Sequence, residues 1–357
     1  MRKNALTTAV VAGLTGVAGL IGTANAVNLN PEGLGQVLIY PYYTGRAGND
    51  TLISVVNTTS DAKAVKVRFL EALNSTEVLD FNLYLSEFDV WTARVSPNDL
   101  DDPTGASGGK MVTADTSCTV PYFYGNREDG ASFAEQPFLT FAIDDDGGPE
   151  TMDRTTSGYV EIIEMGTLTN EVKGTADAVT HTSEGQPAAC QQLVDAWTTV
   201  SDNSPVPPTD ELDNYWAGDA NEAGDPDIDL DSPSGGLFGG GSIIAVEKGT
   251  MFSYNATAID NFDTAINHFN PGNVRPNLGD AQGQSVVFES NSAAPVTSTW
   301  ANAGGGNLRG ILAVNAVLTV DTLMNEYVLG GMANARTEWV VTMPTKRPHV
   351  NASTAPI

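Results

Sequence analysis

The chain has 357 residues, of which 44 are acidic and 17 are Lys or Arg, and its formal net charge is −27 at pH 7. This charge disfavours nucleic acid and anionic lipid as partners, because the main attraction in both comes from Lys and Arg. It favours solubility and, where carboxylates cluster, the binding of divalent cations.

Residues 1–26 have the features of an export signal. Arg2 and Lys3 supply a positive start, Ala5–Ile21 is an apolar run, and Ala24-Asn25-Ala26 fits a cleavage site between small residues. An uncleaved membrane anchor is the alternative, but the run is short for a span, and no later stretch reaches about 18 apolar residues. We therefore predict an exported protein, in the periplasm, on the cell surface or outside the cell, with no transmembrane segment after cleavage.

Four short runs between residues 51 and 95 are rich in β-branched, aromatic and leucine residues, and polar turn-formers separate them. In Ala64–Leu70 the apolar residues alternate with Lys66 and Arg68, and Leu79–Leu85 alternates in the same way. This period of two predicts that one face lies in a core and the other in water. The sequence thus predicts a mainly β fold, built as a β-sandwich. The runs are Thr51–Asn57, Ala64–Leu70, Val78–Leu85 and Asp89–Val95.

One part of this region resembles a known class of module. The strand that ends in Val56-Asn57-Thr58-Thr59 is followed by a polar turn and then by an alternating strand. In this respect the chain resembles bacterial Ig-like periplasmic and surface modules over about 60 residues. The resemblance implies an Ig-like β-sandwich for residues 27–165, and it transfers no functional residue because it includes no diagnostic motif.

Gln36–Tyr43 is predicted as the first strand, interrupted at Pro41, which indicates an edge position or a switch between sheets. We expect it to pair within its own chain. The alternative is that it adds to the sheet edge of a neighbouring subunit. Its tyrosines, Tyr40, Tyr42 and Tyr43, are interpreted as packing residues, with a platform for stacking sugars as the alternative.

The only two cysteines, Cys118 and Cys190, are predicted to form a disulfide in an oxidising compartment. The closed loop of about 73 residues would stabilise the fold by roughly 4 kcal/mol. It would tether a long insertion, residues 166–241, which is acidic and partly disordered by composition. Ala188–Val200 is the one helix predicted there.

Residues 242–357 are predicted to form a second β region that packs on the first or extends it. The insertion ends with the Gly-rich run Gly235–Gly241. Gly310–Tyr327 fits either a helix or a strand. Glu338–Met343 is predicted as the final strand, closed off by the prolines that follow.

The segment 225–231 is the sharpest candidate for a binding site, because it carries carboxylates at alternate positions. In an extended segment these side chains share one face and can converge on Ca²⁺. An EF-hand is excluded, since the Gly and Glu that it needs are replaced by Leu230 and Gly236. The alternative is a solvated acidic loop, and Asp144–Asp146 is interpreted in the same two ways. The candidate ligands are Asp225, Asp227, Asp229 and Asp231.

No catalytic motif has the context that its mechanism needs. Gly105–Gly109 matches the string G-x-S-x-G, but the buried strand before it and the helix after it are missing. His181, His268 and His349 lack the spacing of a zinc helix. Paired carboxylates for glycoside hydrolysis depend on a separation in space that a sequence does not show.

These observations favour an exported, non-enzymatic surface or matrix protein with a structural or adhesive role. Two alternatives stay open. One is a carbohydrate-binding or carbohydrate-active protein on a β scaffold, and the other is a filament-type assembly subunit joined by strand addition or by calcium. The expected partners are cell-surface or matrix components, glycans, or further copies of the chain.

Overall fold

A computed structural model gives the fold of most of the chain. It describes residues 25–99, 106–127, 131–139, 147–198, 214–218, 223–288, 294–302, 308–324, 327 and 338–346. Residues 1–24 of the predicted leader, Asp144–Asp146 and His349 lie outside the described residues.

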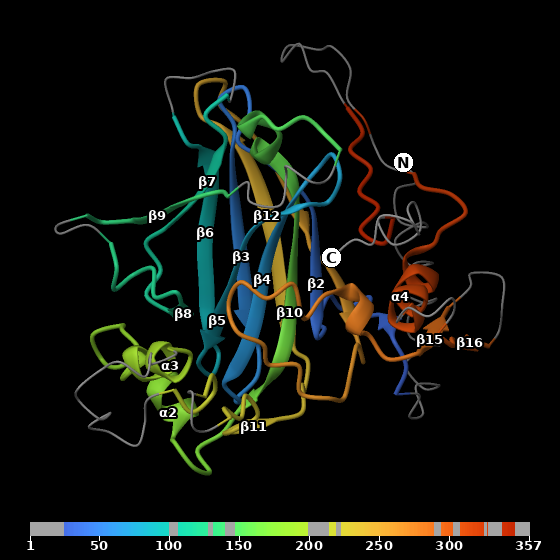
Figure 1. Cartoon of the computed structure of the whole chain (residues 1–357). Helices are drawn as coiled ribbons and strands as arrows, with labels where there is room; N and C mark the ends of the chain where they lie inside the picture. The colour runs from blue at the N-terminus through green and yellow to red at the C-terminus, as the bar shows by residue number, and fades with distance from the viewer. Residues whose placement is uncertain are drawn as a thin grey trace, which may run out of the picture.

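Two antiparallel sheets pack against each other, so the prediction of a mainly β fold is confirmed (Figure 1). Among the described residues, the larger sheet has eight strands and the smaller has six. The larger sheet has the order β1 (Asn28–Leu29), β14 (Thr257–Asp260), β2 (Val37–Thr44), β10 (Ser157–Leu168), β4 (Lys63–Glu71), β5 (Glu77–Leu85) and β8 (Cys118–Val120), with β11 (Leu230–Asp231) paired to β10. The smaller sheet has the order β13 (Thr250–Asn255), β12 (Leu237–Ala245), β3 (Asp50–Asn57), β6 (Val90–Pro97), β7 (Gly109–Thr113) and β9 (Ala134–Pro137).

Short helices and a small ribbon flank the sandwich. The α-helices are α2 (Thr175–Val179), α3 (Cys190–Ala196) and α4 (Arg309–Leu318), and the 3-10 helices are η1 (Met152–Thr156) and η2 (Leu278–Asp280). The ribbon pairs β15 (Gln284–Val287) with β16 (Val296–Thr299). In Figure 1, α2 and α3 lie at one end of the sandwich and α4 lies at its side, next to β15.

Strands from both halves of the chain build the two sheets. β10 lies between β2 and β4, β12 pairs with β3, and β14 pairs with β2. An Ig-like order would place the consecutive strands β2 and β3 side by side in one sheet, whereas β2 belongs to the larger sheet and β3 to the smaller. The sandwich class is therefore confirmed and the Ig-like topology is not.

The inward faces of the two sheets form the main apolar core. Aromatic rings fill it in two groups. Phe81 contacts Trp91 and Phe123, with ring centroids 5.6 and 4.9 Å away. Near the other end, Tyr43 meets Phe69 edge to face with centroids 5.8 Å apart. Tilted and edge contacts are among the favoured ring geometries, and the Phe81–Trp91 contact joins the two sheets.

The outward face of the larger sheet, which points away from the smaller sheet, differs from the prediction. Lys66 and Arg68 were expected to face water, but they are 0% and 7% exposed. Two other parts of the chain cover this face. The insertion packs on the β5 side, around α2 and α3, and the C-terminal part packs on the β2 side, around α4. The alternating pattern correctly predicted a strand. However, a polar sheet face that other segments bury has the same sequence pattern as one that is exposed to solvent.

β12 begins at Leu237, inside the Gly-rich run that the sequence analysis assigned to the insertion. The glycines are needed because neighbouring side chains come very close to the backbone. A side chain at Gly239 would collide with the Tyr40 hydroxyl, and one at Gly241 would collide with the Tyr254 ring. Here glycine permits close packing inside a strand, where composition alone indicated a loop.

Candidate functional site

Five ionisable side chains lie together on the covered outward face of β4, β5 and β10, and we call this group the charge layer. The register places Arg68 opposite Glu161 on one side and opposite Asp80 on the other. Alternate residues of adjacent strands point to the same face, so the sequence itself brings these groups together once the strands pair. The members are Lys66, Arg68, Glu77, Asp80 and Glu161.

Arg68 is the centre of the charge layer. Its Nε donates to Glu77 Oε2 at 2.6 Å and its Nη1 donates to Glu161 Oε2 at 2.7 Å. Burial alone would lower the pKa of Arg68, but the two carboxylates raise it above its ordinary value. Burial raises the pKa of Glu161, while the Arg68 charge opposes this rise. Arg68 therefore stays charged and holds both carboxylates in place.

Lys66 and Asp80 form a looser pair at the edge of the charge layer. Lys66 Nζ lies 3.4 Å from Asp80 Oδ2, and it also donates to the Asn270 carbonyl at 3.2 Å. The backbone N–H of Gly272 donates to Asp80 Oδ1 at 2.6 Å. Asp80 Oδ2 is buried and has no hydrogen-bond partner. Burial lowers the pKa of Lys66, and burial raises the pKa of Asp80 to about 6.

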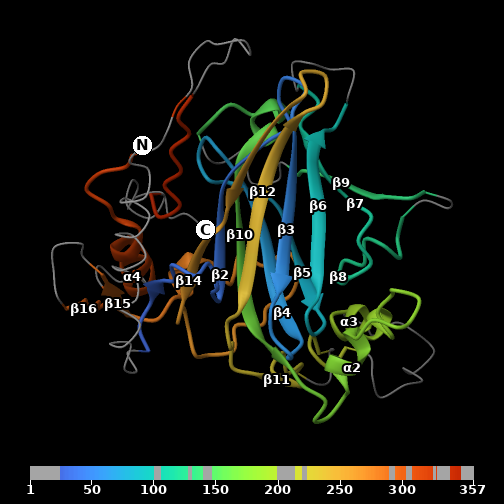
Figure 2. The same ribbon diagram turned by 180° about the vertical axis from the view of Figure 1, so that it is seen from behind.

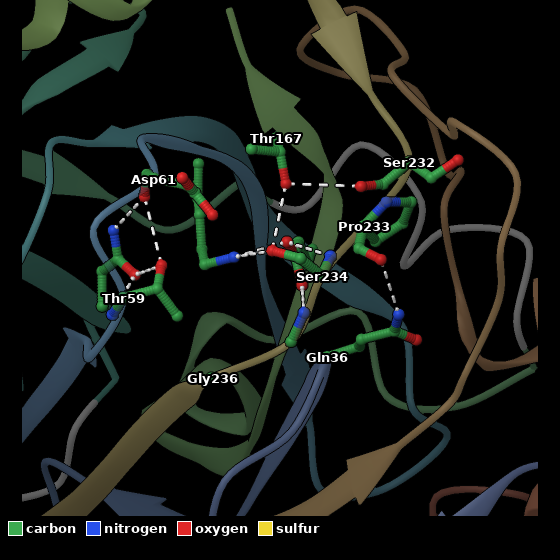
Figure 3. Close-up of polar contacts among 12 residues, drawn as sticks. Gln36, Thr59, Asp61, Thr167, Ser232, Pro233, Ser234 and Gly236 are labelled. Atoms are coloured by element: carbon green, nitrogen blue, oxygen red, sulfur yellow. Dashed lines mark hydrogen bonds and ion pairs between the residues drawn. The ribbon is translucent and has the colours of Figure 1, made fainter. Parts of the chain in front are cut away.

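A second buried pair closes one end of β4. Lys63 Nζ lies 2.8 Å from Glu164 Oε1, and both side chains are fully buried. The backbone N–H groups of Ser234 and Gly235 donate to the same carboxylate at 2.9 and 2.7 Å, and Ser234 Oγ accepts from Lys63 at 2.8 Å. Figure 3 shows Ser234 at the centre of these contacts, where the chain leaves the insertion and enters β12. Every charged atom here has a partner, so the pair has a structural role.

A third pair closes the other end of β4. Glu71 Oε1 lies 3.0 Å from Arg154 Nη2, and the backbone N–H groups of Leu73 and Asn74 donate to Glu71 at 2.8 Å. This carboxylate thereby fixes the turn between β4 and β5. The two end pairs and the charge layer each include a side chain of β4, which makes β4 the strand that organises the polar interior.

His268 and three aromatic side chains form a buried cluster beside the charge layer. His268 Nε2 lies 3.0 Å from the Tyr84 hydroxyl, and His268 Nδ1 lies 2.7 Å from the Pro226 carbonyl oxygen. Trp197 Nε1 donates to the Tyr84 hydroxyl at 2.8 Å, and the Trp216 ring stacks on Tyr84. Burial lowers the pKa of His268 to about 4. The cluster joins β5, the insertion and the C-terminal part, and no spacing in the sequence indicated it.

The predicted calcium ligands are spread along a turn and a strand. Asp229 is buried, and its carboxylate accepts the backbone N–H groups of Val172 and Lys173 at 2.6 and 2.7 Å and that of Thr175 at 3.2 Å. It therefore fixes the loop that leads into α2. This use of Asp229 was not predicted, because the N–H groups that it accepts lie 54 to 57 residues away in the sequence.

The other three candidates lie nearer the surface. Asp225 accepts the backbone N–H of Asp227 at 3.1 Å, and Asp231 is exposed in β11. Within the described residues, no three Asp, Glu, His or Cys side chains are grouped so as to hold a metal ion. Calcium binding by this segment stays a prediction.

The other residues that the sequence analysis singled out take part in the disulfide, the core or a loop. Cys118 and Cys190 form the predicted disulfide, which ties β8 to the start of α3. Tyr40 and Tyr43 are fully buried in the main core. Ser107, from the G-x-S-x-G string, accepts the backbone N–H of Asp99 at 3.1 Å in a loop.

The smaller sheet ends in an exposed edge strand, β13. Met251 and Phe252 on this strand are 69% and 61% exposed. Figure 2 shows no helix over the outward face of β12, β3 and β6 in the described part of the chain. We call the free side of β13 the β13 edge.

The predicted final strand, Glu338–Met343, is not a strand in the structure, and this prediction was wrong. Within the described residues its backbone joins no sheet. Its apolar side chains are more than half exposed, and the Thr342 hydroxyl donates to the Pro41 carbonyl. The sequence has strand-forming composition, but a strand also needs an edge to pair with. The exposed side chains are Trp339, Val340, Val341 and Met343.

Comparison with protein-family models, with curated proteins and with solved structures finds no match to this chain. Among the helices that the structure describes, none has the length and apolar character needed to cross a membrane. The function must therefore be argued from the geometry above.

Proposed function

We propose that the protein is an exported, non-enzymatic structural subunit that associates with further copies of itself by strand addition at the β13 edge. The sandwich is the scaffold for this role, and its kinship with Ig-like surface modules is part of the same proposal. The observation that carries the proposal is an edge strand that lacks the usual protection against pairing.

Soluble proteins protect sheet edges with proline, charge or a very short strand, because an open edge pairs readily with other chains. At the opposite edge of the smaller sheet, β9 is four residues long and contains Glu135 and Pro137. β13 has six residues, none of them charged or proline, and two of its apolar side chains are exposed. In a chain with a net charge of −27, which opposes contact between copies, a neutral apolar edge is a place where association is least disfavoured.

The segment Glu338–Met343 of a second copy is the occupant that fits this edge. It has strand-forming residues, it is exposed, and it is unpaired within the described residues. It also lies in a locally basic stretch of an acidic chain, since Arg336, Lys346 and Arg347 flank it. Attraction between this stretch and the acidic surface of another copy would guide the encounter, and main-chain hydrogen bonds would supply the affinity.

The alternatives have less support. β2, the strand first considered as a donor, pairs on both sides within its own sheet. The tyrosine platform considered for sugars is not exposed, because Tyr40 and Tyr43 lie in the core.

Cysteine cross-linking between two variants tests the proposal. Met251→Cys and Val340→Cys are purified separately, mixed and oxidised mildly. The native cysteines do not interfere, because they are already paired with each other. We expect a disulfide-linked dimer that contains one copy of each variant, because each partner supplies only one half of the contact.

Leu73→Cys is the matched control, since Leu73 is 55% exposed in a loop far from β13 in sequence. Mixed with Val340→Cys, it should give only the background level of dimer. The proposal fails if the two mixtures give the same yield. It also fails if a Met251→Cys, Val340→Cys double variant cross-links within single chains while the mixture does not.

A further inference from the structure

We propose that Lys66 and Asp80 condense to form an intramolecular amide that joins β4 to β5, with Glu77 transferring the proton. The register pairs Lys66 with Asn82 and Arg68 with Asp80, so Lys66 and Asp80 are diagonal neighbours on one face of adjacent strands. Long side chains reach each other at this position. Lys66 Nζ and Asp80 Oδ2 are 3.4 Å apart, so the amine lies directly beside the carboxyl group that it would attack.

This pair differs from the other buried ion pairs of the described residues. Arg68 and Glu77 are joined by a hydrogen bond of 2.6 Å, and Lys63 and Glu164 by one of 2.8 Å. The Lys66–Asp80 separation is longer, and Asp80 Oδ2 is buried without a hydrogen-bond partner. A carboxylate oxygen left in this state is costly, so the arrangement needs an explanation. The lack of a partner is explained if Asp80 Oδ2 is the oxygen that leaves during a reaction.

The surroundings favour the reactive form of each group. Burial lowers the pKa of Lys66, although Asp80 and Glu77 oppose this effect. Burial raises the pKa of Asp80 to about 6; Lys66 lowers it, while the charge of Glu77 raises it. Together these shifts favour a neutral amine, which is a nucleophile, beside a protonated carboxyl group. The Arg68 guanidinium holds Glu77 beside this pair, where the charge of Glu77 acts on both Lys66 and Asp80.

The reaction is balanced without any other reactant. The lone pair of Lys66 Nζ forms a bond to Asp80 Cγ, and the carbonyl electrons move to Oδ1, where the Gly272 N–H already donates. One proton passes from Nζ to the Glu77 carboxylate and then to the hydroxyl oxygen Oδ2. That oxygen leaves as water when the carbonyl bond forms again, and Glu77 returns to its starting state.

The product fits the site better than the ion pair does. The amide N–H can keep the bond to the Asn270 carbonyl, and the amide oxygen can keep the bond to the Gly272 N–H. The unpartnered oxygen is gone, and two buried charges have become one neutral group. The amide forms within one chain and does not depend on association between copies. Its test is therefore independent of the test of the proposed function.

The intact mass of the purified full chain tests the proposal. The mass is measured on unfolded, reduced protein and compared with the mass expected from the sequence and the N-terminus found by peptide sequencing. We expect a deficit of one water molecule. Fragmentation of a protease digest should place the deficit in a branched peptide that links Lys66 to Asp80, which distinguishes it from a cyclised Asp within one linear peptide.

Three variants make the test specific. Lys66→Arg removes the nucleophile and should restore the full mass. Glu77→Gln keeps both reacting groups but removes the proton-transfer group, and it should also restore the full mass. Lys63→Arg is the matched control, because it changes another buried lysine of β4, and it should keep the deficit. A wild-type chain at the full expected mass overturns the proposal, and so does a deficit that persists in Lys66→Arg or Glu77→Gln.

Discussion

His268 is a buried imidazole with both ring nitrogens in contact with neighbours. One nitrogen lies near the Tyr84 hydroxyl and the other near the Pro226 carbonyl oxygen. A proton added to the ring would place a charge among Trp197, Trp216 and Tyr84, away from water. The cluster therefore requires the neutral ring, and acidification should weaken the joint between β5, the insertion and the C-terminal part.

The pKa of His268 falls from 6.5 to about 4 in the folded protein, which fixes the sign of its effect. Above pH 6.5 the ring is neutral in both states, and its full contribution is present. As the pH falls from there towards 4, the unfolded chain binds a proton that the folded chain does not, so stability is lost, by roughly 3 kcal/mol in total.

The measurement is the free energy of unfolding of the wild type minus that of His268→Phe. This difference should shrink from neutral pH to about pH 4.5. Burial raises the pKa of Glu161 and Glu164, and these groups act in the opposite direction in both proteins, so only the difference isolates His268. A difference that does not change with pH would contradict the prediction.

Individual elements show where local sequence suffices and where it does not. The strands from Thr51 to Val95 were predicted because their composition and period are local properties. The start of β12 was assigned to a loop because its glycines serve close packing, and Glu338–Met343 was mistaken for a paired strand because pairing depends on a distant edge. In each case the error came from a tertiary contact that the segment itself does not encode.

The disulfide and α3 attach the insertion to the larger sheet. Cys118 lies in β8 at the edge of the larger sheet, and Cys190 begins α3, at a sequence separation of 72. The apolar side chains of α2 and α3 pack beside the bond, so it fixes their position on the sheet.

Replacing both cysteines by Ser should lower the free energy of unfolding by up to about 4 kcal/mol, because the unfolded chain regains the freedom of a long loop. It should also speed proteolysis of the insertion while the sandwich strands stay protected. Denaturant titration gives the first quantity, and timed digestion with mass spectrometry gives the second. Equal digestion of the sandwich and the insertion would show that the bond does not hold the insertion selectively.

At the scale of the whole molecule, the sequence predicted the class of fold, the disulfide and the acidic surface. It did not predict the charge layer or the His268 cluster. Lys66 and Arg68 could be read as surface residues because only the packing of two distant segments buries them. The cluster draws on Tyr84, Trp197 and His268, whose distances along the chain follow no period.

The net charge makes association between copies depend on salt. Raising the ionic strength screens the repulsion between chains of charge −27 but leaves main-chain pairing at the β13 edge intact. Light scattering after size exclusion should therefore show a mass that rises with salt. Phe252→Lys should abolish this rise, whereas Leu73→Lys, at similar exposure, should not. A mass that falls with salt would mean that the contact is mainly electrostatic.

The sharing of both sheets by the two halves of the chain limits how this protein can be cut or recombined. A fragment that stopped before residue 237 would lack β12 and β14, so β3 and β2 would each lose a neighbour. It would also lack the residues around Asn270, which contact Lys66 and shield it from solvent. Any truncation or fusion of this protein therefore has to keep residues 27–318 together. New sequence has to be joined outside this range.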